Sequence, residues 1–176
     1  MKKIALYLLY TILFFGALLF FTPKESVYYF AEGQLKPLGV ILAHEEAVDH
    51  GFTLELTHID LYVQKIKSAE IGSVTLGIFG FYNSAAAADI LLDKTFEAFF
   101  PPLIQRAELH QSLIDPLHIN ANAVGDFGEA EARVDLLERS VQLFLKPSRL
   151  MRTRYKSTLR QLKKTKEGDY SYEYKF

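Results

Sequence analysis

Apolar and polar residues alternate strictly in several stretches of this chain, and the closing sequence YSYEYKF shows the pattern most clearly. Residues 170–176 carry an aromatic ring at every second position. The same alternation runs through residues 52–57, 74–78, 117–123, 130–136 and 141–145. A period of two is typical of β-strands that bury one face. The pattern therefore predicts a sheet whose apolar face has to be covered.

The alternation changes phase inside the first of these stretches. Leu54 and Leu56 are apolar at even positions, whereas Ile59 and Leu61 are apolar at odd positions. A phase change within an extended segment indicates a β-bulge or a bend. We expect two or three antiparallel strands between residues 52 and 81, one of them irregular in this way.

Short turns join the later strands into a meander. The tetrapeptide GDFG at residues 125–128 has the composition of a turn, and LERS at residues 137–140 is read in the same way. Pro147 ends the last strand of this series. The apolar positions of all these strands form a candidate apolar sheet face: Leu54, Leu56, Leu76, Val134, Leu136, Leu143, Leu145, Tyr172 and Tyr174.

Two segments have the spacing of amphipathic helices. The first covers residues 83–100, with Ser84 as its N-cap and two prolines after it. The second covers residues 149–166, with Ser148 as N-cap and Gly168 in the C-cap role. Residues 27–30 and 38–42 are read as short strands of a connecting segment.

Residues 4–21 contain no charged side chain and are long enough to cross a membrane as a helix. Lys2 and Lys3 precede the run, and Pro23 follows it. A cleaved signal peptide is the alternative, but its small-residue cleavage site is missing here. We expect an uncleaved anchor with a cytoplasmic N-terminus. Its core residues are Ile4, Leu8, Leu13, Phe15, Leu19 and Phe21.

The chain length of 176 residues allows about one domain beyond this anchor. We expect an anchor at residues 1–23, a connecting segment at 24–50 and a β-rich domain at 51–176. The expected fold class is mainly β with two helices, in which an N-terminal transmembrane helix precedes a curved antiparallel sheet, an open barrel or a taco-like sheet. The chain has no Cys, which excludes disulfides and thiolate chemistry.

Positive charge is concentrated in the second expected helix. Residues 148–166 include no acidic side chain, whereas the chain as a whole has a net charge of −1. Two interpretations explain this pattern. The basic side chains form the solvated face of a helix whose apolar face packs on the sheet, or they bind an acidic partner or an anionic membrane surface. Nucleic acid is not an expected partner. The candidate binding residues are Arg149, Arg152, Arg154, Lys156, Arg160, Lys163 and Lys164.

Motifs for catalysis or metal binding are weak. The segment HEEAVDH at residues 44–50 departs from the zinc-protease pattern because Val48 stands where the second histidine belongs. The sequence has no glycine-rich phosphate loop, dinucleotide fingerprint or nucleophile elbow. We expect a non-enzymatic protein with no cofactor and no metal.

Two segments resemble type II secretion system protein N and its AsmA-like relatives. They are LELTHIDLYVQKIKSAEIGSVTL and GDFGEAEARVDLLERSVQLFLKPS, and the closing GDYSYEYKF is similar as well. The resemblance covers residues 50–176 and implies a single-pass inner-membrane protein with a periplasmic β-domain. In the secretion family it implies assembly or support of the secretion machine. In AsmA-like proteins it implies lipid handling by a curved sheet with an apolar concave face.

The expected function is therefore that of an anchored periplasmic accessory protein of a type II secretion or pilus-type machine, acting by protein binding. The alternative is a lipid-binding or lipid-transfer module. The expected partners are the membrane, an envelope protein, and phospholipid or lipopolysaccharide. An open apolar groove would favour the lipid alternative, whereas a face filled by the protein's own side chains would favour the assembly factor.

Overall fold

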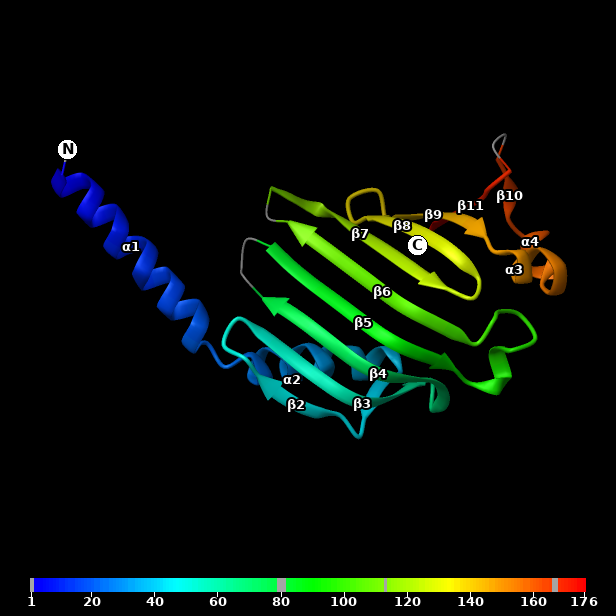
Figure 1. The fold of residues 1–176 in the computed structure, drawn as a ribbon, viewed down its shortest axis with the longest axis horizontal. Helices are drawn as coiled ribbons and strands as arrows, with labels where there is room; N and C mark the ends of the chain where they lie inside the picture. The colour runs from blue at the N-terminus through cyan, green and yellow to red at the C-terminus, as the bar shows by residue number, and fades with distance from the viewer. Residues whose placement is uncertain (1, 79–81, 113, 166–167) are drawn as a thin grey trace.

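The computed structural model describes residues 2–78, 82–112, 114–165 and 168–176 and shows one large antiparallel sheet with helices at both ends (Figure 1). The described residues form four α-helices: α1 (Lys2–Phe21), α2 (Lys24–Leu35), α3 (Arg149–Arg154) and α4 (Lys156–Leu159). They also form two 3-10 helices, η1 (Lys36–Leu38) and η2 (Lys94–Phe96).

Eleven strands make up the sheet in the described parts of the chain. They are β1 (Val40–Ala43), β2 (Glu46–Asp49), β3 (Thr53–Val63), β4 (Ile66–Ile78), β5 (Tyr82–Leu92), β6 (Leu103–Ser112), β7 (Asp115–Gly125), β8 (Gly128–Asp135), β9 (Ser140–Pro147), β10 (Lys163–Lys164) and β11 (Tyr170–Lys175). Their order is β1-β3-β4-β5-β6-β7-β8-β9-β11-β10, and β2 pairs with the first half of β3. The edge strands β1 and β10 do not pair with each other in the described residues, so this sheet is open.

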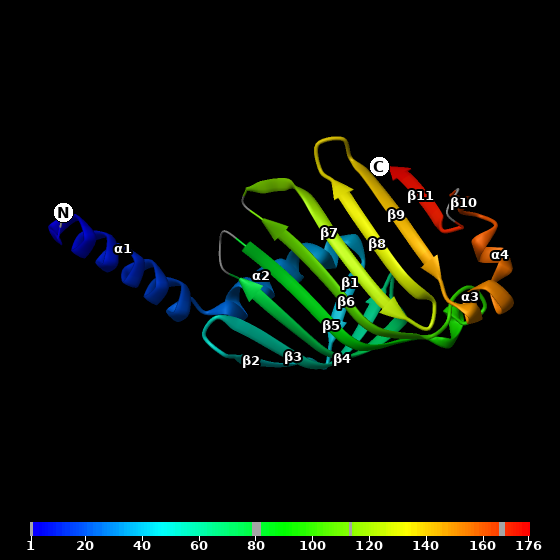
Figure 2. The ribbon, with the colours of Figure 1, turned by 45° about the horizontal axis from the view of Figure 1, so that its top comes forward.

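The expected mainly-β class and open, curved sheet are confirmed, and the sheet curls strongly in Figure 2. The expectation of two helices beyond the anchor is wrong, because three follow α1 in the described chain. The meander predicted from the alternation at residues 117–123, 130–136 and 141–145 is confirmed as β7 to β9. Two strands, β3 and β4, fall within residues 52–78, and the end of the predicted stretch, residues 79–81, lies outside the described chain.

The predicted irregularity near the start of the sheet is a bend that four strands share. His58 has a φ of 57° and Asp89 a φ of 54°, and Gly72 stands between them in the sheet. Gln105 extends this bend row into β6. Pairing keeps its register across the bend from β3 to β6, because each strand has the additional residue at the same level. Side chains therefore change phase together, and the same sheet face stays apolar.

Residues 24–35 form the helix α2, so the strand predicted at residues 27–30 is wrong. Tyr28 and Glu32 are four residues apart, which places them on one face of a helix, and both are buried. Tyr28 packs on Leu54, Leu56 and Ile59 of β3. Large apolar side chains at this end of the sheet need a cover, and the helix provides it. The strand predicted at residues 38–42 is present as β1.

The helix predicted at residues 83–100 is also wrong. Residues 82–92 are the strand β5, followed by η2. Alanine favours helices, but β5 pairs along its length with β4 on one side and β6 on the other. Ser84 therefore pairs with Gly77 and His110 instead of capping a helix.

The single helix predicted at residues 149–166 is split into α3 and α4. Ser148 caps α3 as predicted, and its Oγ accepts a hydrogen bond from the Met151 backbone N–H at 3.1 Å. Tyr155 breaks the helix with a φ of −111° and a ψ of 39°. Gly168 lies in the β10–β11 turn with a φ of 92°, so its predicted C-cap role is wrong.

The predicted GDFG turn is confirmed as the β7–β8 connection. Gly128 has a φ of 114°, and a Cβ there would lie 2.1 Å from the Lys146 carbonyl oxygen. Ser148 closes the turn by donating its Oγ–H to the Asp126 carbonyl at 2.6 Å. This links the turn to the start of α3 and fixes Phe127 in the core at this end of the sheet.

Candidate functional site

The face of the sheet that carries α2, α3 and α4, here called the inner face, contains two continuous rows of apolar side chains. Each row crosses all strands from β3 to β11 through paired residues. The first row is Leu54, Leu76, Ala85, Leu109, Ala121, Ala132, Leu143 and Tyr172, and the second is Leu56, Val74, Ala87, Ala107, Ala123, Ala130, Leu145 and Tyr170. The inner face is thus apolar from one end of the sheet to the other.

Side-chain size changes along these rows. Leucine and valine occupy the β3–β4 end of the rows, and leucine and tyrosine occupy the β9–β11 end. The centre of the rows is mostly alanine. The small central side chains leave a hollow of about 310 Å³, here called the alanine hollow. Its lining residues are Val74, Ala85, Ala87, Ala107, Glu108, Leu109, Ala121, Asn122, Ala123, Ala130, Ala132 and Leu143. Alanine is depleted in strands, so its use here gives space rather than strand propensity.

A second hollow of about 560 Å³, here called the aromatic hollow, lies between the sheet and the segment before β6. Ala130 and Leu143 line both hollows, so the two adjoin and form one apolar groove. Phe99 and Phe100 at its rim are 55% and 41% exposed, which is unusual for phenylalanine. The remaining lining residues are Leu92, Pro101, Ile104, Phe127, Leu145, Thr158, Gln161, Leu162 and Tyr172.

Packed clusters lie at the two ends of this groove. At one end Tyr28 of α2 covers Leu54, Leu56 and Ile59. Burial raises the pKa of Tyr28 far above its usual range, and the nearby carboxylates of Glu45 and Glu32 add to this shift. The phenol is therefore neutral and donates to a Glu45 carboxylate oxygen at 3.3 Å.

At the other end Met151, Tyr155 and Leu159 pack on Leu145 and Phe127. These three side chains come from the segment that was predicted as one amphipathic helix. Their burial agrees with the amphipathic spacing predicted for residues 149–166, although two helices, α3 and α4, share the buried side chains.

Most of the predicted sheet-face residues lie on the inner face. Leu54, Leu56 and Leu145 are buried, and Leu76 and Leu143 are half-buried in the two rows. Val134 pairs with Val141, which in turn pairs with Tyr174, in a third row next to them. Tyr172 and Tyr174 are 45% and 54% exposed. Leu136 lies beyond the end of β8 in the β8–β9 turn and is exposed, so its prediction as a face residue is wrong.

The aromatic strand at the C-terminus pairs with β9 and not with the strands at residues 52–76. Tyr172 is paired with Leu143, and Tyr174 is paired with Val141. This pairing puts two tyrosine rings at the far edge of the apolar rows. Their partial exposure suits a phenol, which combines an apolar ring with a polar tip.

The predicted basic residues do not all gather in one place. A third hollow, of about 490 Å³, is lined by Arg152, Lys156, Arg160 and Lys164, together with Leu159, Leu162, Gly168 and Tyr170. Arg149, Arg154 and Lys163 are exposed and do not line it. Residues 166 and 167 are outside the described chain.

The predicted anchor residues lie on α1, the one described helix that is long and apolar enough to cross a membrane. Its side chains are almost all exposed, which excludes α1 from the packed core. Ile4, Leu8, Leu13 and Phe15 are each more than half exposed.

Histidine and acidic side chains form small pairs on the surface. His44 contacts Asp60 at 3.0 Å, and His50 contacts Glu55 at 3.1 Å, so the two histidines of HEEAVDH face different partners. Within the described residues, no group of three or more His, Cys, Asp or Glu side chains is arranged to hold a metal ion.

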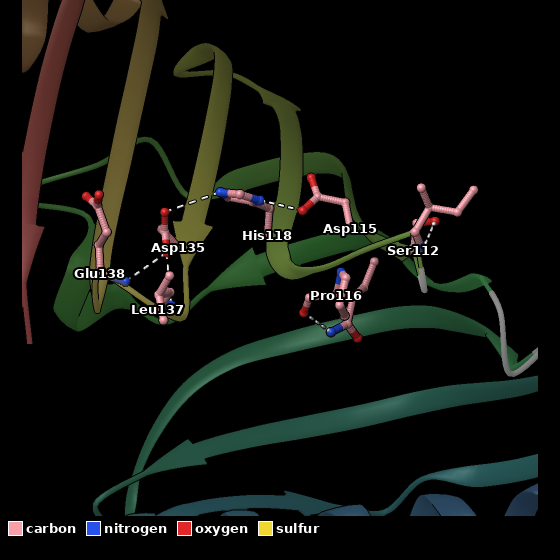
Figure 3. A network of polar contacts seen from close by, with 9 residues as sticks. Ser112, Asp115, Pro116, His118, Asp135, Leu137 and Glu138 are labelled. Atoms are coloured by element: carbon pink, nitrogen blue, oxygen red, sulfur yellow. Dashed lines mark hydrogen bonds and ion pairs between the residues drawn. The ribbon is translucent and has the colours of Figure 1, made fainter.

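A polar network surrounds His118 on β7 (Figure 3). Its Nδ1 contacts the Asp115 carboxylate at 2.5 Å, and its Nε2 contacts Asp135 at 3.2 Å. The hydrogen bond to Asp115 raises the pKa of His118. Asp135 also accepts from the Leu137 and Glu138 backbone N–H groups, which ties β7 to the β8–β9 turn. This network has a structural role.

The sequence analysis did not identify the alanines that line the alanine hollow, here called the alanine floor, or the exposed Phe99 and Phe100 at the rim of the aromatic hollow. The alternation of residues 117–136 places four of these alanines on one face of the sheet, and their small size indicates that this face has open space. The alanines of β5 were not recognised as strand residues, because a run of alanines favours a helix.

Comparison of the chain with protein-family models, with curated proteins and with solved structures finds no match.

Proposed function

We propose that the protein is a membrane-tethered binding protein for lipid, whose groove on the inner face holds an acyl chain. The observation that carries this proposal is the alanine floor of the two rows, which leaves open, apolar space where leucine or phenylalanine would fill it. The alanine and aromatic hollows, about 310 and 560 Å³, fall in the size range of small-molecule sites. In the described residues, no group of three or more His, Cys, Asp or Glu side chains that could hold a metal ion accompanies them.

The apolar helix α1 supports the same proposal, because an anchor would hold the groove next to a lipid source. Lys2 and Lys3 favour a cytoplasmic N-terminus, which puts the sheet on the opposite side of the membrane. In this proposal the protein is a single-pass protein of a bacterial inner membrane, and its sheet lies in the periplasm. Exposed aromatic rings at the rim of the groove would contact the entering chain.

Photo-crosslinking of the full-length chain in bacterial membranes tests this function. Benzoylphenylalanine replaces either Leu109 or Val124. Leu109 lies in the groove. Ala121 and Ala123 of β7 are on the inner face, so Val124 points to the opposite face of the sheet. Leu109 and Val124 are 41% and 45% exposed, so they form a matched pair. Cells labelled with radioactive acetate should give a lipid adduct at position 109 and only background at position 124.

A larger side chain in the alanine hollow provides the second arm of this test. The Ala107→Phe variant should reduce the adduct at position 109 severalfold while the protein unfolds at a similar temperature. Equal labelling at positions 109 and 124, or labelling that Ala107→Phe does not change, would overturn the proposal.

An assembly role in a type II secretion or pilus-type machine is the second candidate function. The observation that favours it is the edge of β11, since β10 pairs only with Tyr170 and Ser171 and leaves the rest of that edge without a strand in the described chain. Such an edge can add a strand of a partner protein through backbone hydrogen bonds. Benzoylphenylalanine in place of Tyr174 should then yield a protein adduct rather than a lipid adduct.

A further inference from the structure

The basic hollow next to α4 is lined by four cationic side chains, and the described residues that line it include no acidic one. Arg152, Lys156, Arg160 and Lys164 come from α3, α4, the turn after α4, and β10. The described residues give none of the four an ion pair with a carboxylate. Arg152 is held in place, because its Nε–H donates to the Pro147 carbonyl oxygen at 3.1 Å.

Four like charges around one hollow repel one another, and an anion between them would remove that cost. Arginine and lysine together suit a phosphate group, since arginine donates in a planar fork and lysine supplies a compact point charge. The volume of the hollow, about 490 Å³, is large enough for a small polar group.

The basic hollow adjoins the apolar groove. Leu162 lines both the basic hollow and the aromatic hollow, so it forms a wall between them. Tyr170 and Tyr172 are two residues apart on β11 and therefore point to the same side of the strand. Tyr170 lines the basic hollow, and Tyr172 lines the aromatic hollow. Positive charge thus stands directly beside the end of a long apolar site.

We infer that the groove is selective for an anionic, phosphate-bearing lipid, whose phosphate lies in the basic hollow while its acyl chain lies along the inner face. This inference rests on the proposed lipid-binding function and adds the chemical class of the ligand. The charge of the basic hollow and its position beside the aromatic hollow suit one molecule that has both a phosphate and an acyl chain.

The position of the basic hollow separates this site from simple attraction to the anchoring membrane. Figures 1 and 2 both show α1 at one end of the molecule and α3 and α4 at the opposite end. The four cations therefore do not lie beside the end of the apolar helix. A ligand taken from a membrane, rather than the membrane surface itself, is what this arrangement suits.

The test uses the full-length chain with benzoylphenylalanine at position 109, reconstituted in phosphatidylcholine vesicles. One preparation contains a trace of radioactive phosphatidylglycerol, and the other contains an equal trace of radioactive phosphatidylcholine with the same acyl chains. Phosphatidylglycerol should label the protein about tenfold more strongly, given four cations near one anionic headgroup. The double variant Lys156→Gln with Arg160→Gln should bring its labelling close to that of phosphatidylcholine.

A matched control removes the same charge from outside the hollow. The double variant Arg149→Gln with Lys163→Gln should leave the preference for phosphatidylglycerol unchanged, because neither side chain lines the basic hollow. If both double variants lose the preference equally, general surface attraction explains it, and the inference is overturned.

The remaining outcomes separate the two proposals. Equal labelling by both lipids would overturn the inference on the headgroup and leave the lipid-binding function standing. Labelling by neither lipid would overturn the function and the inference together.

Discussion

His118 is the residue whose ionisation is most directly coupled to the fold. It bridges Asp115 at the start of β7 and Asp135 at the end of β8. The Asp115 hydrogen bond raises the pKa of His118, and desolvation and Arg133 oppose that shift. A histidine whose pKa is raised in the folded state stabilises that state when it is protonated.

We therefore expect wild-type stability to gain from His118 below its ordinary pKa and to lose this gain as the pH rises through the raised folded-state value. The His118→Gln variant should differ from wild type more at pH near 6 than at pH near 8. Thermal unfolding of the full chain in a nonionic detergent measures this difference. A difference that is independent of pH would show that His118 acts only through packing.

Lys24 is the residue that joins two elements, the apolar helix and the β-domain. Its side chain is only 1% exposed, and its Nζ donates to the carbonyl oxygens of Leu19 and Thr22, both at 2.9 Å. The last carbonyls of a helix lack partners within the helix, and a cation satisfies them well. The Lys24 backbone N–H donates to Asp49 at 3.2 Å, which links the start of α2 to the end of β2.

The Lys24→Met variant should loosen this junction, because it removes donors from buried carbonyl groups. We expect a loss of about 1–3 kcal/mol in the free energy of local opening. Hydrogen exchange of the backbone amides at residues 19–25, measured on the full chain in detergent, should become correspondingly faster. Lys94→Met is the control, since Lys94 is exposed and should have almost no effect there. Similar exchange in both variants would contradict a capping role.

Elements with a strict period of two could be predicted from the sequence, whereas those fixed by tertiary contacts could not. β7, β8, β9 and β11 alternate clearly and were predicted. β5 was not, because its alanines have high helix propensity and only the pairing with β4 and β6 makes them a strand. α2 was missed for the converse reason, since its aromatic residues favour strands and burial on β3 selects the helix.

The candidate site was predictable only in part, for a related reason. Alternation shows which side chains share a face of the sheet. It does not show which parts of that face are packed against other side chains and which parts stay open as a groove. The groove depends on alanines from four strands, β5 to β8, and these come together only when the strands are in register. The basic hollow likewise depends on the break at Tyr155, which the helical spacing of residues 149–166 does not reveal.

The whole molecule has an apolar helix at one end (Figure 1). Its apolar groove lies on the inner face of the sheet. If α1 is a retained anchor, the intact mass of the protein from bacterial membranes should include residues 1–23. The protein should also stay with the membranes during alkaline carbonate extraction, because an apolar helix of this length does not leave the bilayer. Removal of residues 2–21 should release the protein. An intact mass that begins near residue 24 would instead identify a cleaved signal sequence.

The bend row of His58, Gly72, Asp89 and Gln105 restricts how this chain can change length during evolution. Deletion of His58 alone would leave Gly72 of β4 without its facing residue in β3, and half of β3 would have to slip by one position. A slip of one residue turns side chains to the opposite face, which would expose Leu54 and Leu56 or Ile59. Within β3 to β6 a loss or gain at this level therefore disturbs the pairing unless the facing residues change with it, whereas the border with β7 already accommodates Gln105 through a register shift.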